Sequence, residues 1–380
     1  MKSLTILGST GSIGTQALDI VRAYPHEFEV YGLCCGGNVE LLERQIVEFK
    51  PKVVAVKDEE AARRLDAHGA EVLCGSDAAR LLAARKVDLL LNALVGISGF
   101  LPTVAAIEAG SGIALANKET LVAGGDVIDD LCKKRGTRIL PVDSEHSAIW
   151  QCLDRRAEDA PKCESLILTA SGGPFRGKKA EEIAGATLAD AIKHPTWNMG
   201  VKVTVDSASM MNKGFEIIEA MHLFGVPADR IEVVVHRQSV VHSMVRFADG
   251  SVIAQMSYPD MKLPISLALL YPERGSACFS PLSFDGLSLD FEKPDLDTFK
   301  CLKLATQCAA IGGLYPTALN AANEIAVDKF VKGIIKFGEI PYYINEALQA
   351  FVPQGDSRNA EDVLAADARV RELTQKLTEI

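Results

Sequence analysis

Residues 4–14 read LTILGSTGSIG, and this stretch decides the fold. The apolar run 4–7 predicts a strand, and residues 15–22 have the apolar spacing of a helix. The glycines between them are spaced G-x-x-G-x-x-G, which differs from the G-x-G-x-x-G dinucleotide fingerprint and from the G-x-x-x-x-G-K-[ST] phosphate loop. Glycines at such a turn let backbone N–H groups approach a pyrophosphate at the helix N-terminus. We therefore predict a dinucleotide site; the alternative is a structural glycine-rich turn.

The same alternation of strands and helices continues to about residue 145. Short β-rich runs at 28–33, 53–56, 89–93, 113–116 and 138–142 are separated by helical stretches, the clearest at 39–49. Strands that alternate with helices indicate a parallel sheet with crossover helices. We predict a doubly wound α/β, Rossmann-like domain over residues 1–145.

The pattern changes after Gln151. Residues 165–170, 202–205 and 232–236 read as strands, and a hairpin is predicted around the turn 248–250. Residues 146–280 thus form a predicted α+β catalytic and dimerisation domain, with a mobile loop around 193–202. Residues 281–298, rich in Ser, Asp, Pro and Gly, read as a linker. Helical spacing at 301–310, 317–333, 340–351 and 360–377 predicts a C-terminal helical bundle over 299–380.

Composition limits the class of protein. The chain has 380 residues with 48% hydrophobic and 24% charged residues, as in a globular protein with a large core. No apolar run approaches the roughly 18 residues of a membrane span. The first strand begins at about Ser3, so we expect no signal or transit peptide and a cytoplasmic location, with a mature organelle form as the alternative.

Charge and cysteine content exclude other classes. A net charge of −10 argues against binding of nucleic acid, so a phosphorylated substrate would need a local cationic pocket. The nine cysteines lack zinc-ligand spacing, and we interpret them as reduced thiols.

The end of the second predicted strand bears on the choice of dinucleotide. NAD-specific sites usually place an Asp or Glu there to bind the ribose 2′-hydroxyl. Residues 33–38 read LCCGGN and contain no acid, which favours NADP. They contain no Arg or Lys either. The 2′-phosphate must then be held by backbone N–H groups, by Asn38, or by a cation elsewhere in the chain.

Acidic residues follow a strand in PVDSEHSAIW, residues 141–150. Asp143 and Glu145 could direct two hard oxygen ligands at Mg²⁺ or Mn²⁺; the alternative is helix capping by Asp143. In residues 203–220, VTVDSASMMNKGFEIIEA, we expect a strand, a polar turn and a helix. Glu216 could add a third carboxylate, or be a solvated helix residue with Glu219 as its neighbour. The polar side chains around the helix start could hold a phosphate, namely Ser207, Ser209, Asn212 and Lys213.

Three further stretches are candidates for parts of one site. The turn Ser171-Gly172-Gly173-Pro174 could form an anion-binding nest or only a tight turn. The loop KHPTWNMG, residues 193–200, is a candidate lid, or a loop packed into a domain interface. The stretch ALANKETL, residues 114–121, ends a strand of the α/β domain, where ligands of open sheets bind. Taken together, these features point to reduction of a phosphorylated, metal-chelating carbonyl compound.

At these residues the chain closely resembles the 1-deoxy-D-xylulose 5-phosphate reductoisomerases, NADPH- and metal-dependent enzymes of the non-mevalonate isoprenoid route. The resemblance extends from Met1 to the C-terminal helices. It rests on eight motifs in the order of the family: GSTGSIG, LANKE, PVDSEH, SGGPF, HPTWNMG, VDSASMMNKGFE, HRQSVVHSMV and TALNAANE.

The resemblance implies a role for each matching residue. It places the cofactor NADPH on Thr10, Gly11, Ser12, Ile13, Gly36, Gly37, Asn38, Asn117, Glu119 and Gly200. It places a divalent metal, Mg²⁺, Mn²⁺ or Co²⁺, on Asp143, Glu145 and Glu216. It places the sugar phosphate on Lys118, Ser144, Ser171, His194, Ser207, Asn212 and Lys213. The expected catalytic residues are Lys118, Ser144, Glu145, His194, Trp197 and Met199, of which Trp197 and Met199 belong to the lid.

The implied reaction is rearrangement and reduction of 1-deoxy-D-xylulose 5-phosphate to 2-C-methyl-D-erythritol 4-phosphate, with the metal as Lewis acid. The implied assembly is a homodimer, with neither nucleic acid nor membrane as a partner. One departure is Gly37, where the family often has Lys or a similar residue, and it leaves the strength of the preference for NADPH over NADH open. The alternatives are a metal-free dehydrogenase and a module that binds NADPH without chemistry.

Overall fold

The computed structural model describes residues 1–197, 199–276 and 279–378, and the chain divides into two compact units. The first unit contains Met1–Thr120, Ile128–Ser144 and Asp260–Ser280. The second contains Leu121–Val127, Glu145–Pro259 and the chain from Pro281 onward. The predicted boundaries at 145, 280 and 298 stay predictions. Asp260–Ser280 nevertheless groups with the N-terminal sheet, and the C-terminal helices group with the central sheet.

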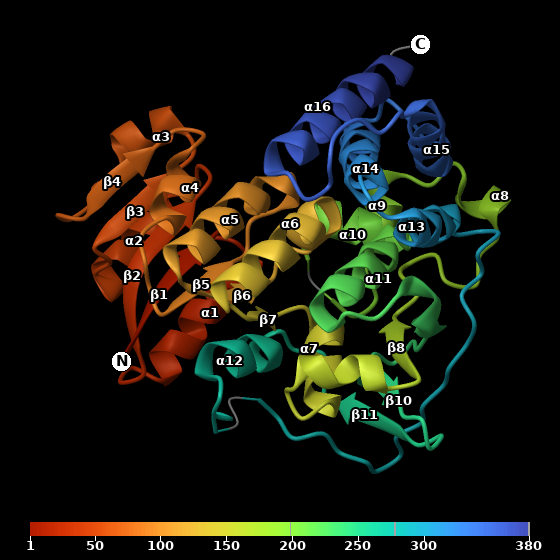
Figure 1. The fold of residues 1–380 in the computed structure, drawn as a ribbon, viewed down its shortest axis with the longest axis horizontal. Coiled ribbons are helices and arrows are strands. Elements are labelled where there is room, and N and C mark those ends of the chain that lie inside the picture. Colours follow the sequence, from red (N-terminus) through yellow and green to blue (C-terminus); the bar gives the residue numbers. More distant parts are fainter. Residues whose placement is uncertain (198, 277–278, 379–380) are drawn as a thin grey trace. The chain divides into compact units, whose positions relative to one another are not determined.

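The first unit is a parallel sheet in the order β4-β3-β2-β1-β5-β6-β7 with helices on both faces (Figure 1), so the predicted α/β fold is confirmed. Its strands are β1 (Lys2–Leu7), β2 (Phe28–Cys35), β3 (Val53–Val56), β4 (Glu71–Cys74), β5 (Leu89–Asn92), β6 (Gly112–Leu115) and β7 (Ile139–Pro141). Its helices are α1 (Ser12–Ala23), α2 (Val39–Phe49), α3 (Glu59–Arg64), α4 (Ala78–Ala83), α5 (Phe100–Ala109) and α12 (Lys262–Leu270). Helix α6 (Glu119–Arg135) lends its residues 121–127 to the second unit.

Alternating strand residues face two helical layers. Leu4 and Ile6 of β1 share a core with apolar residues of α1, α2 and α12. A Cβ built on Gly32 of β2 would lie 2.8 Å from the Leu82 side chain, so α4 packs closely against this strand. Successive residues of a strand point to opposite faces. The near-continuous apolar strands are what a sheet covered on both faces requires.

The strand order reverses beside β1, and the glycine-rich turn lies there. Strands β2 to β4 extend to one side of β1, and β5 to β7 extend to the other. Gly8 has φ +83°, and a Cβ on it would lie 2.6 Å from the Ala93 carbonyl oxygen at the end of β5. A Cβ on Gly14 would lie 2.2 Å from the Gly8 oxygen. Only glycines fit here, and the turn is therefore placed at the switch point, where open α/β sheets bind ligands.

The second unit has a mixed sheet in the order β11-β10-β8-β9, in which only the β8–β9 pair is parallel within the described residues. The strands are β8 (Ser165–Ala170), β9 (Ile231–Val235), β10 (Val241–Arg246) and β11 (Val252–Met256). The predicted hairpin is thus confirmed. The helices before residue 260 are α7 (Ser144–Cys152), α8 (Ala180–Ile183), α9 (Leu188–Ala191), α10 (Val201–Ala208) and α11 (Met211–Phe224).

The C-terminal helices pack onto this unit. They are α13 (Lys300–Ile311), α14 (Tyr315–Val331), α15 (Ile340–Ala350) and α16 (Ala360–Leu377). Helix α13 lies so close to α11 that a Cβ on Gly214 would stand 2.2 Å from the Ala305 Cβ. Helix α14 packs against both α15 and α16. No helix in the described residues is both long and apolar enough to span a membrane.

Two sequence-based predictions of local structure were wrong. Residues 202–205 were predicted as a strand from alternating valines, but they lie in α10. Lys202 and Asp206 form an i,i+4 ion pair of 2.8 Å on this helix, and Asp206 is held by Asn323 of α14. Tertiary packing here overrides the β-propensity of valine. The strand β4 was missed because its residues are half-buried or exposed and its apolar run, residues 72–74, is only three residues long.

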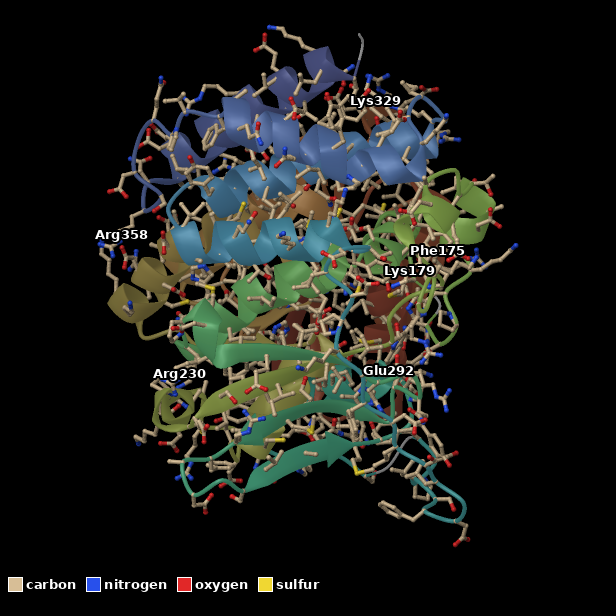
Figure 2. All side chains as sticks on the ribbon, turned by 90° about the vertical axis from the view of Figure 1, so that its right-hand side faces the viewer. Phe175, Lys179, Arg230, Glu292, Lys329 and Arg358 are labelled. Carbon is tan, nitrogen blue, oxygen red and sulfur yellow. The ribbon has the colours of Figure 1, made fainter. Side chains whose placement is uncertain are left out.

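Residues 281–298 are irregular apart from one contact with the sheet. The backbones of Glu292 and Val235 exchange hydrogen bonds of 2.8 and 2.9 Å. Lys179 Nζ forms an ion pair of 3.1 Å with Asp295. Figure 2 labels Phe175, Lys179 and Glu292. The segment is therefore fixed to the second unit at its middle and near its end.

We expect Gly214→Ala to lower the free energy of unfolding by about 1–3 kcal/mol, because the added methyl overpacks the α11–α13 contact. Chemical denaturation monitored by circular dichroism measures the change. Gly185→Ala is the matched control, because a Cβ there meets no atom within 4 Å. Equal stability of the two variants would contradict this packing.

Candidate active site

The glycine-rich turn of the first unit exposes backbone donors at the start of α1. Gly11 is the N-cap, no side chain caps the helix, and no acidic residue lies in its first turn. The buried side chain of Gln45 donates from Nε2 to the Ser9 carbonyl oxygen at 2.9 Å and holds the turn. An uncapped helix start attracts an anion through its free N–H groups and its dipole. The predicted residues 10–13 occupy this turn and the first helical positions.

The residues after β2 also lie in the open. Gly36, Gly37 and Asn38 are exposed, and nothing lies within 4 Å of a Cβ built on Gly36. Asn38 Oδ1 accepts a hydrogen bond of 3.2 Å from the Leu41 N–H and so caps α2. The side-chain oxygen of Asn38 therefore already accepts a hydrogen bond from the helix. Its role toward a cofactor stays a prediction.

Asn117 is a structural link at the end of β6. Its Nδ2 donates to the carbonyl oxygens of Leu94 and Gly96, each at 3.0 Å, and to Glu119 Oε2 at 2.9 Å. The side chain is 1% exposed. The geometry therefore favours a role in fixing the turn after β5 against the start of α6. The neighbouring Lys118 forms an ion pair of 3.0 Å with Asp143.

Two carboxylates converge on one ammonium group in the second unit. Lys213 Nζ lies 2.8 Å from Glu145 Oε1 of α7, and it also binds Glu216 Oε2 one turn along α11. Lys213 is 4% exposed and Glu216 is 1% exposed. Burial lowers the pKa of Lys213, but the two carboxylates and their hydrogen bonds outweigh it and leave that pKa raised. Lys213 is thus charged, and both acids are positioned for a cation.

The remaining polar residues of α11 and the preceding helix lie beside this pair. Asn212 Nδ2 donates to Glu216 Oε1 at 2.5 Å. Ser207 lies in the last turn of α10 instead of in the predicted polar turn after a strand. Asp143 is in the first unit, two residues before Glu145 in the chain. Its place in the metal set stays a prediction, and so does the contact of Ser144 with the substrate.

Sequence reasoning missed a buried pair behind these carboxylates. His146 Nε2 lies 2.9 Å from the Glu216 carbonyl oxygen, and His146 Nδ1 lies 3.2 Å from Glu219 Oε2. Both His146 and Glu219 are fully buried, and Glu216 is 1% exposed, so Glu216 is not the solvated helix residue of the alternative interpretation. The available signal was the i,i+3 spacing of Glu216 and Glu219, which places them on the same side of a helix.

The turn after β8 meets the candidate lid. His194 Nε2 lies 3.1 Å from Ser171 Oγ, and Ser171 Oγ accepts from the Gly173 N–H at 3.2 Å. Gly173 has φ +65°, and a Cβ on it would lie 2.7 Å from the Ser207 carbonyl oxygen. This close approach brings the Ser171 turn against the end of α10. Three predicted residues from separate segments, Ser171, His194 and Ser207, are therefore neighbours.

His194 organises its own loop. Its Nδ1 accepts hydrogen bonds from the backbone N–H groups of Thr196 at 3.2 Å and Trp197 at 2.8 Å. The ring proton must then be on Nε2, which donates to Ser171. The Trp197 ring lies 6.1 Å from that of His242, a second residue that sequence reasoning missed. Burial lowers the pKa of both histidines, while the Glu145 carboxylate opposes the shift.

The end of the loop begins α10. Gly200 is the N-cap of that helix, and its carbonyl oxygen accepts from Thr204 Oγ1 at 2.9 Å. The Met199 carbonyl oxygen lies 3.4 Å from the same hydroxyl. The predicted mobile loop 193–202 includes Asn198, which lies outside the described residues. Its mobility stays a prediction.

Comparison with family models decides the family. The 1-deoxy-D-xylulose 5-phosphate reductoisomerase model matches residues 4–125, and the model of that enzyme's C-terminal domain matches residues 139–224. A further DXP reductoisomerase C-terminal domain model matches residues 256–373. The chain belongs to this family.

Named relatives agree over nearly the whole chain. The 1-deoxy-D-xylulose 5-phosphate reductoisomerase of Caldanaerobacter subterraneus subsp. tengcongensis is 50% identical over 377 residues, which cover 98% of each chain. A Bacillus anthracis relative named 1-deoxy-D-xylulose 5-phosphate reductoisomerase 1 is 46% identical over 99% of this chain and 98% of its own. The resemblance drawn from the eight motifs is therefore confirmed, and the protein is an oxidoreductase enzyme of this family.

Solved structures are similar as well. A crystal structure of DOX-P reductoisomerase in complex with NADPH, fosmidomycin and magnesium has a TM-score of 0.95 and 39% identity, covering 100% of this chain and 98% of that one. The Zymomonas mobilis enzyme in complex with NADPH has a TM-score of 0.92 and 39% identity, covering 100% and 99%.

We expect Lys213→Met to destabilise the protein in metal-free buffer by about 3 kcal/mol, because it leaves two carboxylates of a buried ion pair without their cation. Thermal and urea unfolding measure the loss. Lys179→Met, which removes the exposed partner of Asp295, is the matched control and should change stability by less than about 1 kcal/mol. Similar losses in the two variants would mean that Lys213 does not neutralise the acids.

We expect the loop after His194 to loosen as the pH falls. The lowered pKa keeps His194 neutral in the folded state, and protonation would remove the Nδ1 acceptor of two N–H groups. This contribution to stability is fully present above the ordinary histidine pKa of 6.5 and is lost as the pH falls toward the lowered folded value. NMR protection factors of the Thr196 and Trp197 amides should stay constant above the ordinary histidine pKa of 6.5 and fall as the pH drops below it. His194→Asn should abolish this pH dependence, and constant protection in the unmodified protein would refute it.

Proposed function

We propose that the protein converts 1-deoxy-D-xylulose 5-phosphate to 2-C-methyl-D-erythritol 4-phosphate with NADPH and a divalent metal, in isoprenoid biosynthesis. The observation that carries the proposal is the convergence of Glu145 and Glu216, from two helices, on one cationic position. The family membership adds the reaction. Relatives solved with NADPH, magnesium and fosmidomycin support the same ligands here.

The acidic residues fit a divalent metal. Glu145 and Glu216 already hold a positive charge between them, and carboxylate oxygens are the ligands that Mg²⁺ and Mn²⁺ prefer. Asp143 would complete the set from its place two residues before Glu145. When bound, the metal supplies Lewis acidity to the substrate oxygens. The His146–Glu219 pair would keep Glu216 in position through its contact with the Glu216 carbonyl oxygen.

Lys213 and Asn212 would serve the phosphate. Both now bind the carboxylate of Glu216, so a cation there would free the ammonium and the amide to donate elsewhere. The Ser171 turn and Ser207 lie against each other and would supply further donors. Lys118 and Ser144 would bind the oxygenated carbons. A phosphate remote from the reacting bonds can provide binding energy for orientation and closure.

The first unit fits a dinucleotide. The uncapped start of α1 and the close glycine turn leave room for a pyrophosphate against backbone N–H groups. When bound, NADPH supplies the hydride that reduces the rearranged aldehyde. Thr10, Gly11, Ser12 and Ile13 would contact the pyrophosphate, and Gly36 to Asn38 the adenosine end. Glu119 would contact the nicotinamide half, with Gly200 reaching the cofactor from the loop.

The loop around His194 would cover the substrate. His194 links Ser171 to the backbone of Trp197, so a ligand that binds Ser171 would also set the position of the indole. The Trp197 ring and Met199 would then exclude water from the reacting carbons. Opening and closing of such a loop can limit turnover.

We also propose that the enzyme is a cytoplasmic homodimer that binds no nucleic acid or membrane. Strand β11 is the edge of its sheet and exposes Val252 and Ile253, at 47% and 48%. An exposed apolar edge strand is a pairing surface that proteins usually cover. Light scattering of the purified protein measures the assembly.

The central experiment supplies the purified protein with 1-deoxy-D-xylulose 5-phosphate, NADPH and Mn²⁺. NADPH absorbance should fall steadily, and the product should be 2-C-methyl-D-erythritol 4-phosphate by mass spectrometry and NMR. EDTA should stop the reaction, and added Mg²⁺, Mn²⁺ or Co²⁺ should restore it. Turnover that survives EDTA would favour a metal-free dehydrogenase.

We expect Glu216→Gln to lower kcat/KM by at least about a hundredfold at a fixed metal concentration, because an amide is a poor ligand for a hard cation. Steady-state kinetics over a range of Mn²⁺ measure the loss, and isothermal titration measures Mn²⁺ affinity directly. Glu232→Gln, at a half-buried pair with Arg246 in the same unit, is the control. Activity like that of the unmodified enzyme would remove Glu216 from the metal set.

A further inference from the structure

The structure offers a cation for the 2′-phosphate of the dinucleotide, which the sequence after β2 lacks. Gly36, Gly37 and Asn38 bring no positive charge to the end of that strand. The carboxyl ends of parallel strands meet at one edge of a sheet, so a neighbouring strand can supply what β2 does not. Strand β3 pairs with β2, with Val56 opposite Cys35.

Lys57 is the residue that follows β3 at this edge. Its backbone N–H donates to the Cys35 carbonyl oxygen at 3.2 Å, and the next N–H, of Asp58, donates to Gly36 at 3.1 Å. These bonds fix the start of the β3–α3 loop against the end of β2. The separation of neighbouring strands, about 4.8 Å, is within the span of a lysine side chain.

Of the two basic residues in the loops at this edge of the sheet, Lys57 is the one whose side chain is exposed. In the loops that directly follow β1 to β7, all of them described, the basic residues are Lys57 and Lys118. Lys118 is buried and paired with Asp143 at 3.0 Å. Lys57 is exposed, and its ammonium has no hydrogen bond or ion pair with a described residue. It can therefore turn toward a ligand without breaking a contact.

The acidic surroundings make this charge necessary. Asp58, Glu59 and Glu60 follow Lys57 directly. Asp58 Oδ1 caps α3 by accepting from the Ala61 N–H at 2.8 Å, while its Oδ2 lies 3.9 Å from a Cβ built on Gly37. An anionic group beside Gly37 would meet the field of that carboxylate. A cation next to it in the chain offsets part of that negative field.

We propose that Lys57 binds the 2′-phosphate of NADPH and is the residue that makes this enzyme prefer NADPH to NADH. The inference rests on the proposed function only for the identity of the cofactor. In this proposal, the positive charge comes from Lys57 after β3, because Gly37 after β2 has no charged side chain.

The test compares Lys57→Ala with Lys52→Ala. Lys52 precedes β3 at the opposite end of the strand and pairs with Glu29 at 2.9 Å, so its removal changes the net charge equally, away from the proposed site. Titration calorimetry with adenosine 2′,5′-bisphosphate and with 5′-AMP measures the 2′-phosphate contact without turnover. Fluorescence titration then gives the affinities for NADPH and NADH.

Lys57→Ala should weaken binding of NADPH and of adenosine 2′,5′-bisphosphate about tenfold, the usual effect of losing one charged hydrogen bond. Binding of NADH and 5′-AMP should change less than about twofold. Placing the charge on β2, in Lys57→Ala/Gly37→Lys, should restore NADPH affinity, because a Cβ on Gly37 meets only ordinary contacts and its φ is not positive.

Equal weakening of NADPH and NADH by Lys57→Ala, or the same effect from Lys52→Ala, would overturn the proposal. Failure of the double variant to recover, with Lys57→Ala selective, would still support it, because the selectivity itself reports the contact. A protein that binds NADPH through Lys57 but does not convert the sugar phosphate would refute the proposed reaction and leave this inference intact.

Discussion

A buried ammonium group between two carboxylates is the interaction on which the second unit depends. Lys213 holds Glu145 of α7 and Glu216 of α11, and all three would be costly to bury singly. His146 adds a contact from α7 to the α11 backbone. Helix α11 packs closely against α13 because Gly214 has no side chain to separate the two helices. The position of the acids is therefore set by helix packing, and not by a flexible loop.

Local sequence patterns predicted most of the fold because the two periodicities are clear along this chain. The helices Val39–Phe49 and Ala360–Leu377 and the strands Val53–Val56 and Ser165–Ala170 begin and end where the patterns predicted. The pattern failed at residues 202–205, where alternating valines belong to a helix. That helix is fixed by the contact of Asp206 with Asn323, a residue more than a hundred positions away. No local signal could have revealed this contact.

For the candidate site as well, the sequence identified several residues but could not show which of them are in contact. Glu145, Lys213, Glu216, Ser171 and His194 could be found in the sequence because each lies in or beside a short run of polar residues. Their pairing could not, since it depends on how α7 and α11 pack. His146, Glu219 and His242 were missed for the same reason: in a linear sequence each looks like an ordinary helix or strand residue. Asn117 is the opposite case: the sequence suggested a cofactor contact, but its side chain donates hydrogen bonds to the backbone carbonyl oxygens of Leu94 and Gly96.

The proposed roles of Lys213 and Lys57 would explain how a chain of net charge −10 can bind anionic ligands. Lys213 is buried, so its charge acts through a low dielectric and is neutralised by acids until another cation replaces it. Lys57 is exposed beside three acids, so its charge is partly screened, and the proposed contact would add affinity only for a dinucleotide that carries a 2′-phosphate. On the proposed roles, burial would suit Lys213 to a ligand that must be held during chemistry. Exposure would suit Lys57 to recognition of a cofactor group that takes no part in the reaction.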